Sequence, residues 1–194
     1  MIGNLKIITG CMGAGKTFEL ARRISVAKIA EKNVALYKPI MGYKDGKFDS
    51  RCGIQIDVNP ISTRLSKYEY LQEFTKANGI IVIDEAQFFG PDDFVWAIKK
   101  ALLSGTSFII SGLVRDYQDE PFGAMPYLLT IADEIIQLFA VCNKCKRQNA
   151  TKTIKKKLCG NQSPLDQSIY EARCSDCIEM IYDNQEEERN KILM

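Results

Sequence analysis

Short apolar runs alternate with longer amphipathic segments along the first two thirds of the chain. Several runs are short and rich in β-branched residues, as is typical of buried strands, namely 5–8, 33–38, 80–83 and 108–110. The segments between them have the length and residue content of helices, namely 17–31, 66–77 and 91–103. A further apolar run at 135–141 is expected to be the last strand of this region. This alternation predicts an α/β fold, with a parallel sheet covered by helices on both faces.

Two regions depart from this pattern. Residues 39–60 contain three glycines and show little periodicity, and a loop this long inside a compact domain is functional or disordered. Beyond residue 141, paired cysteines, lysine-rich patches and turn residues replace the apolar runs. We therefore expect one domain at 1–141, a second at 142–182 and a disordered tail at 183–194.

The composition limits the class of protein. The chain has 194 residues and a formal net charge of +2, which does not favour strong binding to nucleic acid or to a membrane surface. No apolar run approaches the ~20 residues of a membrane span, and the first residues lack the pattern of a signal peptide, so the cytoplasm is the expected compartment. Histidine is absent, which excludes mechanisms that depend on an imidazole base.

Residues 10–17 fit the pattern G-x-x-x-x-G-K-[ST] of a phosphate-binding loop, in its required place between a strand and a helix. The segment reads Gly10, Cys11, Met12, Gly13, Ala14, Gly15, Lys16, Thr17. Its glycines let backbone N–H groups point at phosphate oxygens, and the helix that follows adds its positive N-terminal end. Lys16 supplies a charge for the β- and γ-phosphates, and the hydroxyl of Thr17 can ligate Mg²⁺. The segment therefore predicts binding of ATP or GTP.

Two acids, Asp84 and Glu85, follow directly on the apolar run 80–83. Ligands of parallel sheets bind at the carboxyl ends of the strands, so this position predicts that Asp84 lies near a Mg²⁺ ion held by Thr17. Glu85 would then be placed to accept a proton from an attacking hydroxyl or water. The alternative is a pair of solvated acids at a strand end, which the phosphate loop upstream makes less favourable.

Four of the seven cysteines form two C-x-x-C pairs, Cys142 with Cys145 and Cys174 with Cys177. Two such pairs are typical of tetrahedral zinc, and because thiolates fill all four positions the metal is expected to be structural. Four thiolates also permit an iron–sulfur centre, which we consider the weaker alternative. Nucleic-acid binding by a zinc ribbon is a competing use, with some support from the lysines at 155–157.

With these motifs in order, the chain from about residue 5 to 178 resembles the type II thymidine kinases. The resemblance rests on motifs in the family's order: G-x-M-x-x-G-K-[ST] at 10–17, Tyr37-Lys38-Pro39, Asp49-x-Arg51, Asp84-Glu85-Ala86-Gln87-Phe88-Phe89, Ser111-Gly112-Leu113-Val114-Arg115-Asp116-Tyr117-Gln118, Pro121-Phe122-Gly123, Ala140-Val141-Cys142-x-x-Cys145 and Tyr170-x-x-x-Cys174-x-x-Cys177.

The resemblance implies transfer of the ATP γ-phosphate, with Mg²⁺, to the 5′-hydroxyl of deoxythymidine in pyrimidine salvage. It implies a RecA-like core sheet that binds ATP and a small C-terminal domain in which structural zinc holds a lasso loop over the nucleoside. It further implies a homotetramer, feedback inhibition by the triphosphate dTTP, and no nucleic-acid or membrane partner.

The resemblance also assigns roles to single residues. Glu85 matches the catalytic base, and the ATP site matches residues 10–17 with Asp49, Arg51, Asp84 and Gln87. The thymine pocket matches Met12, Phe88, Leu113, Tyr117, Phe122 and Thr153, and Tyr170 matches a tyrosine of the lasso. Aromatic and apolar walls suit a pyrimidine ring with a methyl group. Arg51 or Arg115 is expected to offset charge on the transferred phosphoryl group.

The sequence also departs from the family pattern. An aromatic residue is usual at Gly13, aspartate at Val114 and phenylalanine at Tyr117, and Cys52 interrupts the pattern that normally follows the arginine. These departures bear on the preference for thymidine over other nucleosides.

Two other classes of function fit parts of the sequence. A nucleic-acid-stimulated ATPase would use residues 84–87 as a helicase-like strand motif and the cysteine ribbon as a grip. A regulatory protein would bind the nucleotide without turnover. For the kinase, we expect metal removal to abolish activity and leave ATP binding intact, because the two sites are predicted on separate domains.

Overall fold

The computed structural model describes residues 2–42, 47–49, 55–77, 79–156 and 169–178. For residues 47–49 and 55–56 only the backbone is described. Arg51, Cys52, Cys159 and the predicted tail at 183–194 lie outside the described residues.

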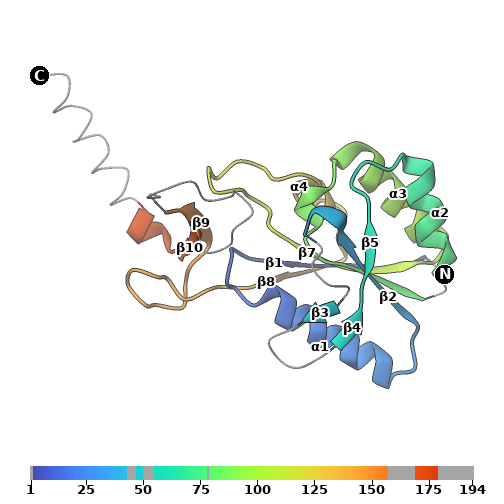
Figure 1. Ribbon diagram of the computed structural model, residues 1–194, viewed down its shortest axis with the longest axis horizontal. Coiled ribbons are helices and arrows are strands. Elements are labelled where there is room, and N and C mark those ends of the chain that lie inside the picture. Colours follow the sequence, from blue (N-terminus) through green and yellow to red (C-terminus); the bar gives the residue numbers. More distant parts are fainter. Residues whose placement is uncertain (1, 43–46, 50–54, 78, 157–168, 179–194) are drawn as a thin grey trace, which may run out of the picture.

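The core is a six-stranded sheet in the order β5-β2-β6-β7-β1-β8 (Figure 1). Its strands are β1 Leu5–Thr9, β2 Val34–Pro39, β5 Asn59–Ile61, β6 Ile80–Ile83, β7 Ser107–Gly112 and β8 Glu134–Gln137. Every neighbouring pair is parallel, and the central register brings Ile7 opposite Ile110 on one side and Ile135 on the other. The α/β fold with a parallel sheet is therefore confirmed.

Helices cover both faces of the sheet (Figure 1). Helix α1, Lys16–Ile29, packs on one face through Leu20, Ala21 and Ile24, and it contacts alternate strand residues such as Ile8 and Val82. Helices α2 Lys67–Lys76, α3 Pro91–Leu103 and α4 Met125–Leu129 pack on the other face, with the short 3₁₀ helices η1 Ile40–Gly42 and η2 Ala86–Phe88 at strand ends. Because side chains alternate along a strand, successive residues of one apolar run serve both cores.

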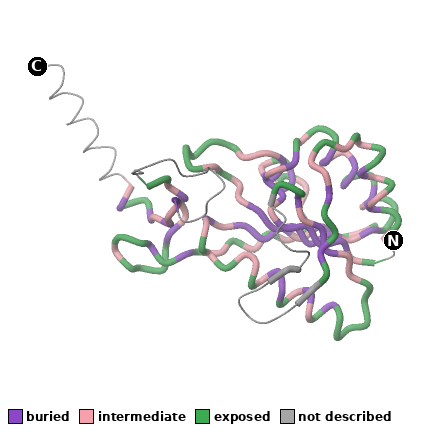
Figure 2. Tube along the Cα trace, viewed as in Figure 1, coloured by how far each residue is buried: buried purple, intermediate pink, exposed green. Residues whose placement is uncertain are grey.

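The face under α2 and α3 carries an aromatic cluster. The rings of Phe74 and Phe94 meet edge to face at 5.9 Å, and those of Phe89 and Phe94 stack at 4.1 Å. Tyr70 and Phe108 also contact this cluster, and Phe74 has no exposed surface. Figure 2 shows buried residues concentrated along the central strands and the inner sides of the helices. Helix α2 begins with a capping box, in which Ser66 and Glu69 are bonded reciprocally.

Several elements were not predicted from the sequence. These are the antiparallel pair β3 Lys47–Asp49 and β4 Gln55–Asp57, and the edge strand β5. Each of these strands is three residues long, which is too short to give a periodic pattern. The predicted strand at 135–141 is shorter in the structure and ends at Gln137, although Leu138 still donates to the carbonyl of Thr9.

The C-terminal module is a separate two-stranded antiparallel sheet of β9 Lys152–Lys155 and β10 Tyr170–Arg173. An antiparallel bridge between Ala140 and Ala150 leads into it from the core sheet. We call residues 140–156 and 169–178 the cysteine module. Its buried cluster consists of cysteines and alanines, including Cys142, Cys174, Ala150 and Ala172.

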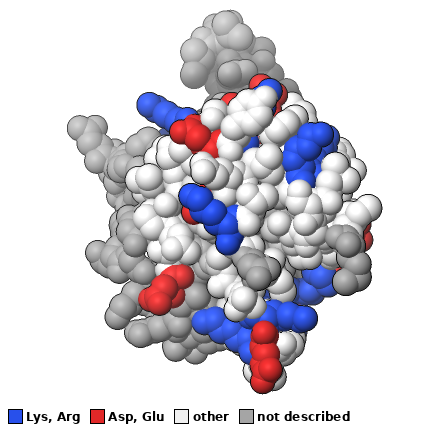
Figure 3. Space-filling view, turned by 90° about the vertical axis from the view of Figure 1, so that its right-hand side faces the viewer, with Lys and Arg blue, Asp and Glu red and all other residues white. Residues whose placement is uncertain are grey.

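No helix in the described ranges is both long enough and apolar enough to cross a bilayer. On the described residues of the face shown in Figure 3, acidic and basic side chains are interspersed among broad uncharged areas. This distribution agrees with the small formal net charge of +2.

We expect the aromatic cluster to contribute strongly to the stability of the fold. Phe74→Ala would leave a cavity between α2 and the sheet and lower the free energy of unfolding by about 3–5 kcal/mol. The matched control is Phe139→Ala, because Phe139 is 46% exposed. Urea unfolding of both variants measures the difference, and an equal loss in the two would contradict the packing described here.

Candidate active site

The phosphate loop occupies the turn between β1 and α1. Gly10, Gly13 and Gly15 have φ angles of 149°, 76° and 87°, a region that residues with a Cβ rarely adopt. A Cβ on Gly10 would also lie 2.4 Å from the carbonyl oxygen of Leu138. The glycine pattern therefore follows from the backbone path, which turns sharply enough to bring the start of α1 to the strand end.

Lys16 begins α1 and points back over the loop. Its Nζ donates to the carbonyl oxygens of Gly10 and Cys11, both at 3.0 Å. Burial lowers the pKa of Lys16, while the nearby carboxylates of Glu85 and Asp84 act to raise it. The phosphate-loop lysine and the predicted acid pair thus lie close enough to interact electrostatically.

Asp84 lies at the carboxyl end of β6 and is only 1% exposed. Its Oδ1 accepts hydrogen bonds from the Ser111 hydroxyl and from the backbone N–H of Glu85. Its Oδ2 forms an ion pair with Nζ of Lys38 at 3.1 Å but accepts no well-aligned hydrogen bond from the described residues. A buried carboxylate oxygen with spare acceptor capacity is suited to a hard cation such as Mg²⁺.

Glu85 adopts a left-handed backbone conformation, with φ 58° and ψ 43°, which is uncommon for a residue other than glycine. Its carboxylate Oε2 accepts from the side-chain amide of Gln87. The other end of that amide, Oε1, accepts from the backbone N–H of Leu113 at 3.0 Å. Gln87 is 2% exposed, so its side chain is a buried bridge between Glu85 and Leu113.

The pKa of Glu85 is raised, first by burial and then by the neighbouring charge of Asp84. The amide of Gln87 and the cations Lys16 and Lys38 oppose this increase. A carboxylate whose pKa is raised is a stronger base than an exposed one, provided that it is ionised. The site therefore contains a candidate proton acceptor beside a candidate phosphate loop.

The residues predicted to line the thymine pocket come together in pairs. The rings of Phe88 and Phe122 meet edge to face at 5.7 Å. The ring of Tyr117 lies 5.9 Å from that of Tyr170, across the boundary between the core and the cysteine module. The third pair is Met12 and Thr153, with the backbone N–H of Met12 donating to Oγ1 of Thr153 at 3.0 Å.

Three residues predicted to contact ATP or the transferred phosphoryl group are not seen to join the site. Asp49 ends β3, where only its backbone is described, and Arg51 lies outside the described residues. Arg115 forms an ion pair with Asp119 at 3.0 Å on the surface.

Sequence reasoning missed Lys38 and Ser111 as partners of Asp84. Lys38 lies near the end of β2 and Ser111 near the end of β7, and these two strands flank β6. Their positions at strand ends were the sequence signal that could have identified them.

The four paired cysteines form one cluster, with all four Sγ atoms within 4.8 Å of one another. The Sγ atoms of Cys145 and Cys174 are 3.7 Å apart, and a tetrahedron with Zn–S bonds of about 2.3 Å has edges of about 3.8 Å. Three of the four side chains are buried. The cluster thus fits a zinc ion held by Cys142, Cys145, Cys174 and Cys177.

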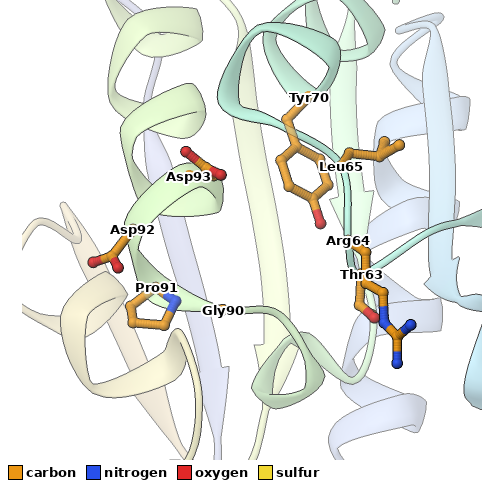
Figure 4. Close-up of a pocket in the computed structure, with 8 residues that line it drawn as sticks. All are labelled: Thr63, Arg64, Leu65, Tyr70, Gly90, Pro91, Asp92 and Asp93. Carbon is orange, nitrogen blue, oxygen red and sulfur yellow. The ribbon is translucent and has the colours of Figure 1, made fainter.

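A hollow between the loop before α2 and the start of α3 lies apart from these groups (Figure 4). Its lining consists of Thr63, Arg64, Leu65, Tyr70, Gly90, Pro91, Asp92 and Asp93. None of these residues is among the predicted site residues.

Comparison with known proteins agrees with this geometry. A family model described as thymidine kinase matches residues 3–178. A thymidine kinase of Mesomycoplasma hyopneumoniae is 37% identical over 179 residues, which cover 90% of this chain and 95% of that protein. A thymidine kinase of Coprothermobacter proteolyticus is 36% identical over 186 residues, which cover 89% of each chain.

Among solved structures, the genome packaging NTPase B204 of Sulfolobus turreted icosahedral virus 2 has a TM-score of 0.49 and 16% identity, over 71% of this chain and 75% of that chain. The family assignment rests on the sequence relatives, and it does not favour the nucleic-acid-stimulated ATPase. Taken with the phosphate loop, the acid pair and the cysteine cluster, these matches show that the chain belongs to the thymidine kinase family.

Proposed function

We propose that this protein transfers the γ-phosphoryl group of ATP to the 5′-hydroxyl of deoxythymidine, with Glu85 as the general base. The observation that carries the proposal is the bridge made by Gln87. Its amide contacts Glu85 at one end and the backbone of Leu113, a predicted wall of the thymine pocket, at the other. A nucleoside kinase needs a base that is held beside the nucleoside pocket and close to the lysine of the phosphate loop. Glu85 is proposed to meet both requirements.

The donor half would consist of the phosphate loop and Asp84. Backbone N–H groups of the loop and Lys16 would bind the β- and γ-phosphates. Thr17 and Asp84 would hold Mg²⁺, which neutralises charge on the phosphate oxygens when bound. The resemblance also gives Asp49, Arg51 and Gln87 to this half; for Gln87 we propose a positioning role, because both ends of its amide are bonded within the protein.

The acceptor half would hold the thymine ring between the pairs Phe88 with Phe122 and Tyr117 with Tyr170. As the 5′-oxygen forms its bond to the γ-phosphorus, the carboxylate of Glu85 takes the hydroxyl proton. The bond from that phosphorus to the bridging oxygen breaks, and the electron pair leaves with ADP. Rate enhancement would come mainly from positioning and from the cations around the transferred group.

Several broader proposals follow from membership of the family. We infer that residues 1–141 form the ATP-binding domain and residues 142–182 a lasso domain held by structural zinc. We also propose a homotetramer, inhibition by dTTP, a cytoplasmic location and a role in pyrimidine salvage. We also propose that the protein has no nucleic-acid or membrane partner, since its formal net charge of +2 does not favour strong binding to either.

The proposed function predicts a specific product. Purified protein with ATP, Mg²⁺ and deoxythymidine should form ADP and deoxythymidine 5′-monophosphate in equal amounts, as measured by mass spectrometry. A parallel panel with deoxyuridine and the other deoxynucleosides should give lower kcat/KM values, because they lack the thymine methyl group or the pyrimidine ring shape. Tight nucleotide binding with no phosphorylated nucleoside in any reaction would contradict the proposal.

A second prediction concerns the base. Glu85→Gln removes the proton acceptor with little change in shape, and kcat should fall by about 10²–10⁴-fold. The dissociation constant for ATP should change little, because Glu85 does not belong to the phosphate loop. Full activity in Glu85→Gln would exclude the assigned role.

A third prediction concerns Lys38, whose charge acts to lower the pKa of Glu85. Activity is lost as the pH falls through that pKa, because the base becomes protonated. In Lys38→Met the pKa of Glu85 rises, so the loss should begin at a higher pH than in the wild type. Lys38→Arg is the matched control that retains the cation. Identical profiles of kcat/KM against pH for Lys38→Met and the wild type would contradict this account.

A further inference from the structure

The phosphate loop is bonded to the cysteine module at two points. The thiol of Cys11 donates to the carbonyl oxygen of Ala150 at 3.3 Å. The backbone N–H of Met12 donates to Oγ1 of Thr153 at 3.0 Å. Both acceptors belong to the segment that leads into and forms β9, 139 and 141 residues away along the chain.

These two contacts belong to one buried cluster. Cys11 is 4% exposed and packs with Ala140 and Ala150, in the same cluster as the metal-binding cysteines Cys142, Cys174 and Cys177. Ala14 of the phosphate loop packs against that cluster as well. The loop and the predicted zinc site are therefore two sides of one small core.

A single peptide unit connects Thr153 to the phosphate-loop lysine. The N–H of the peptide between Cys11 and Met12 donates to Thr153, and the carbonyl of the same peptide accepts from Nζ of Lys16 at 3.0 Å. That carbonyl also accepts from the N–H of Ala14 at 3.2 Å. Because a peptide bond is planar, the hydroxyl of Thr153 fixes the direction of the carbonyl that Lys16 contacts.

We propose that Thr153 is a positioning residue for the phosphate loop, through which the cysteine module controls the affinity for the donor nucleotide. This role is separate from the contact with thymine that the family resemblance gives to Thr153. It rests on the proposed function, since it requires that the loop bind ATP. It also revises the expectation that metal removal leaves ATP binding intact, because that expectation assumed two sites without a shared core.

The test is the dissociation constant for ATP, measured by calorimetry on the zinc-loaded protein with no nucleoside present. Thr153→Val leaves the partly buried N–H of Met12 without its acceptor, and affinity should fall about tenfold. Thr153→Ser retains the hydroxyl and should bind ATP nearly as the wild type does. Thr151→Val is the matched control on the same segment, since the backbone N–H of Thr151 is bonded to Arg173.

The outcomes separate the competing explanations. If Thr153→Val raises only the KM for thymidine and leaves ATP affinity unchanged, Thr153 acts on the acceptor alone and the inference is wrong. If the wild type itself does not bind ATP, the proposed function fails, and the inference fails with it.

A second measurement uses the wild-type protein and does not depend on a folded variant. Alkylation of Cys11 by iodoacetamide, followed by peptide mass spectrometry, should be slow in the zinc-loaded protein and faster after chelation. ATP affinity, measured on parallel samples that receive no iodoacetamide, should fall after chelation. Unchanged alkylation of Cys11 and unchanged ATP affinity after zinc removal would overturn the coupling.

Discussion

Parallel pairing of the central strands is the constraint on which the rest of this structure depends. Because β1, β6 and β7 run in the same direction, their carboxyl ends meet at one edge of the sheet. The phosphate loop follows β1, the acid pair follows β6, and Leu113 follows β7. Residues that are about 30 to 100 positions apart in the sequence thus lie together at one site, because the common direction of the strands brings them there.

The chemistry at this edge depends on the balance of a few charges. Two adjacent carboxylates, one of them almost fully buried, would be costly without nearby cations. Lys38 forms an ion pair with Asp84, while Lys16 contacts the loop and interacts with both acids. Burial raises the pKa of Glu85, and these cations limit the increase. The site therefore holds a carboxylate that is more basic than an exposed one, with cations beside it that favour its ionised form.

Much of this could be predicted from the sequence, because the signals are local. The phosphate loop, the acid pair, the cysteine pairs and the capping box at Ser66 are fixed by residues a few positions apart. The three-residue strands β3, β4 and β5 were missed, since they are too short for a period to be visible. The contacts of Lys38 with Asp84 and of Met12 with Thr153 join distant segments, and the local patterns of a sequence do not specify such pairs. The packing of Cys11 against the cysteine module was not predicted either, because it also joins distant segments.

The central claim is that Glu85 is a partly buried carboxylate with a raised pKa that accepts the hydroxyl proton. The most direct measurement is the infrared band of its protonated carboxyl group, identified as the difference between the wild type and Glu85→Gln across a pH titration. The account predicts a midpoint above the value of about 4.3 for an exposed glutamate, coincident with the acid limb of kcat/KM. A midpoint at or below that value, or an acid limb that does not follow it, would contradict the account.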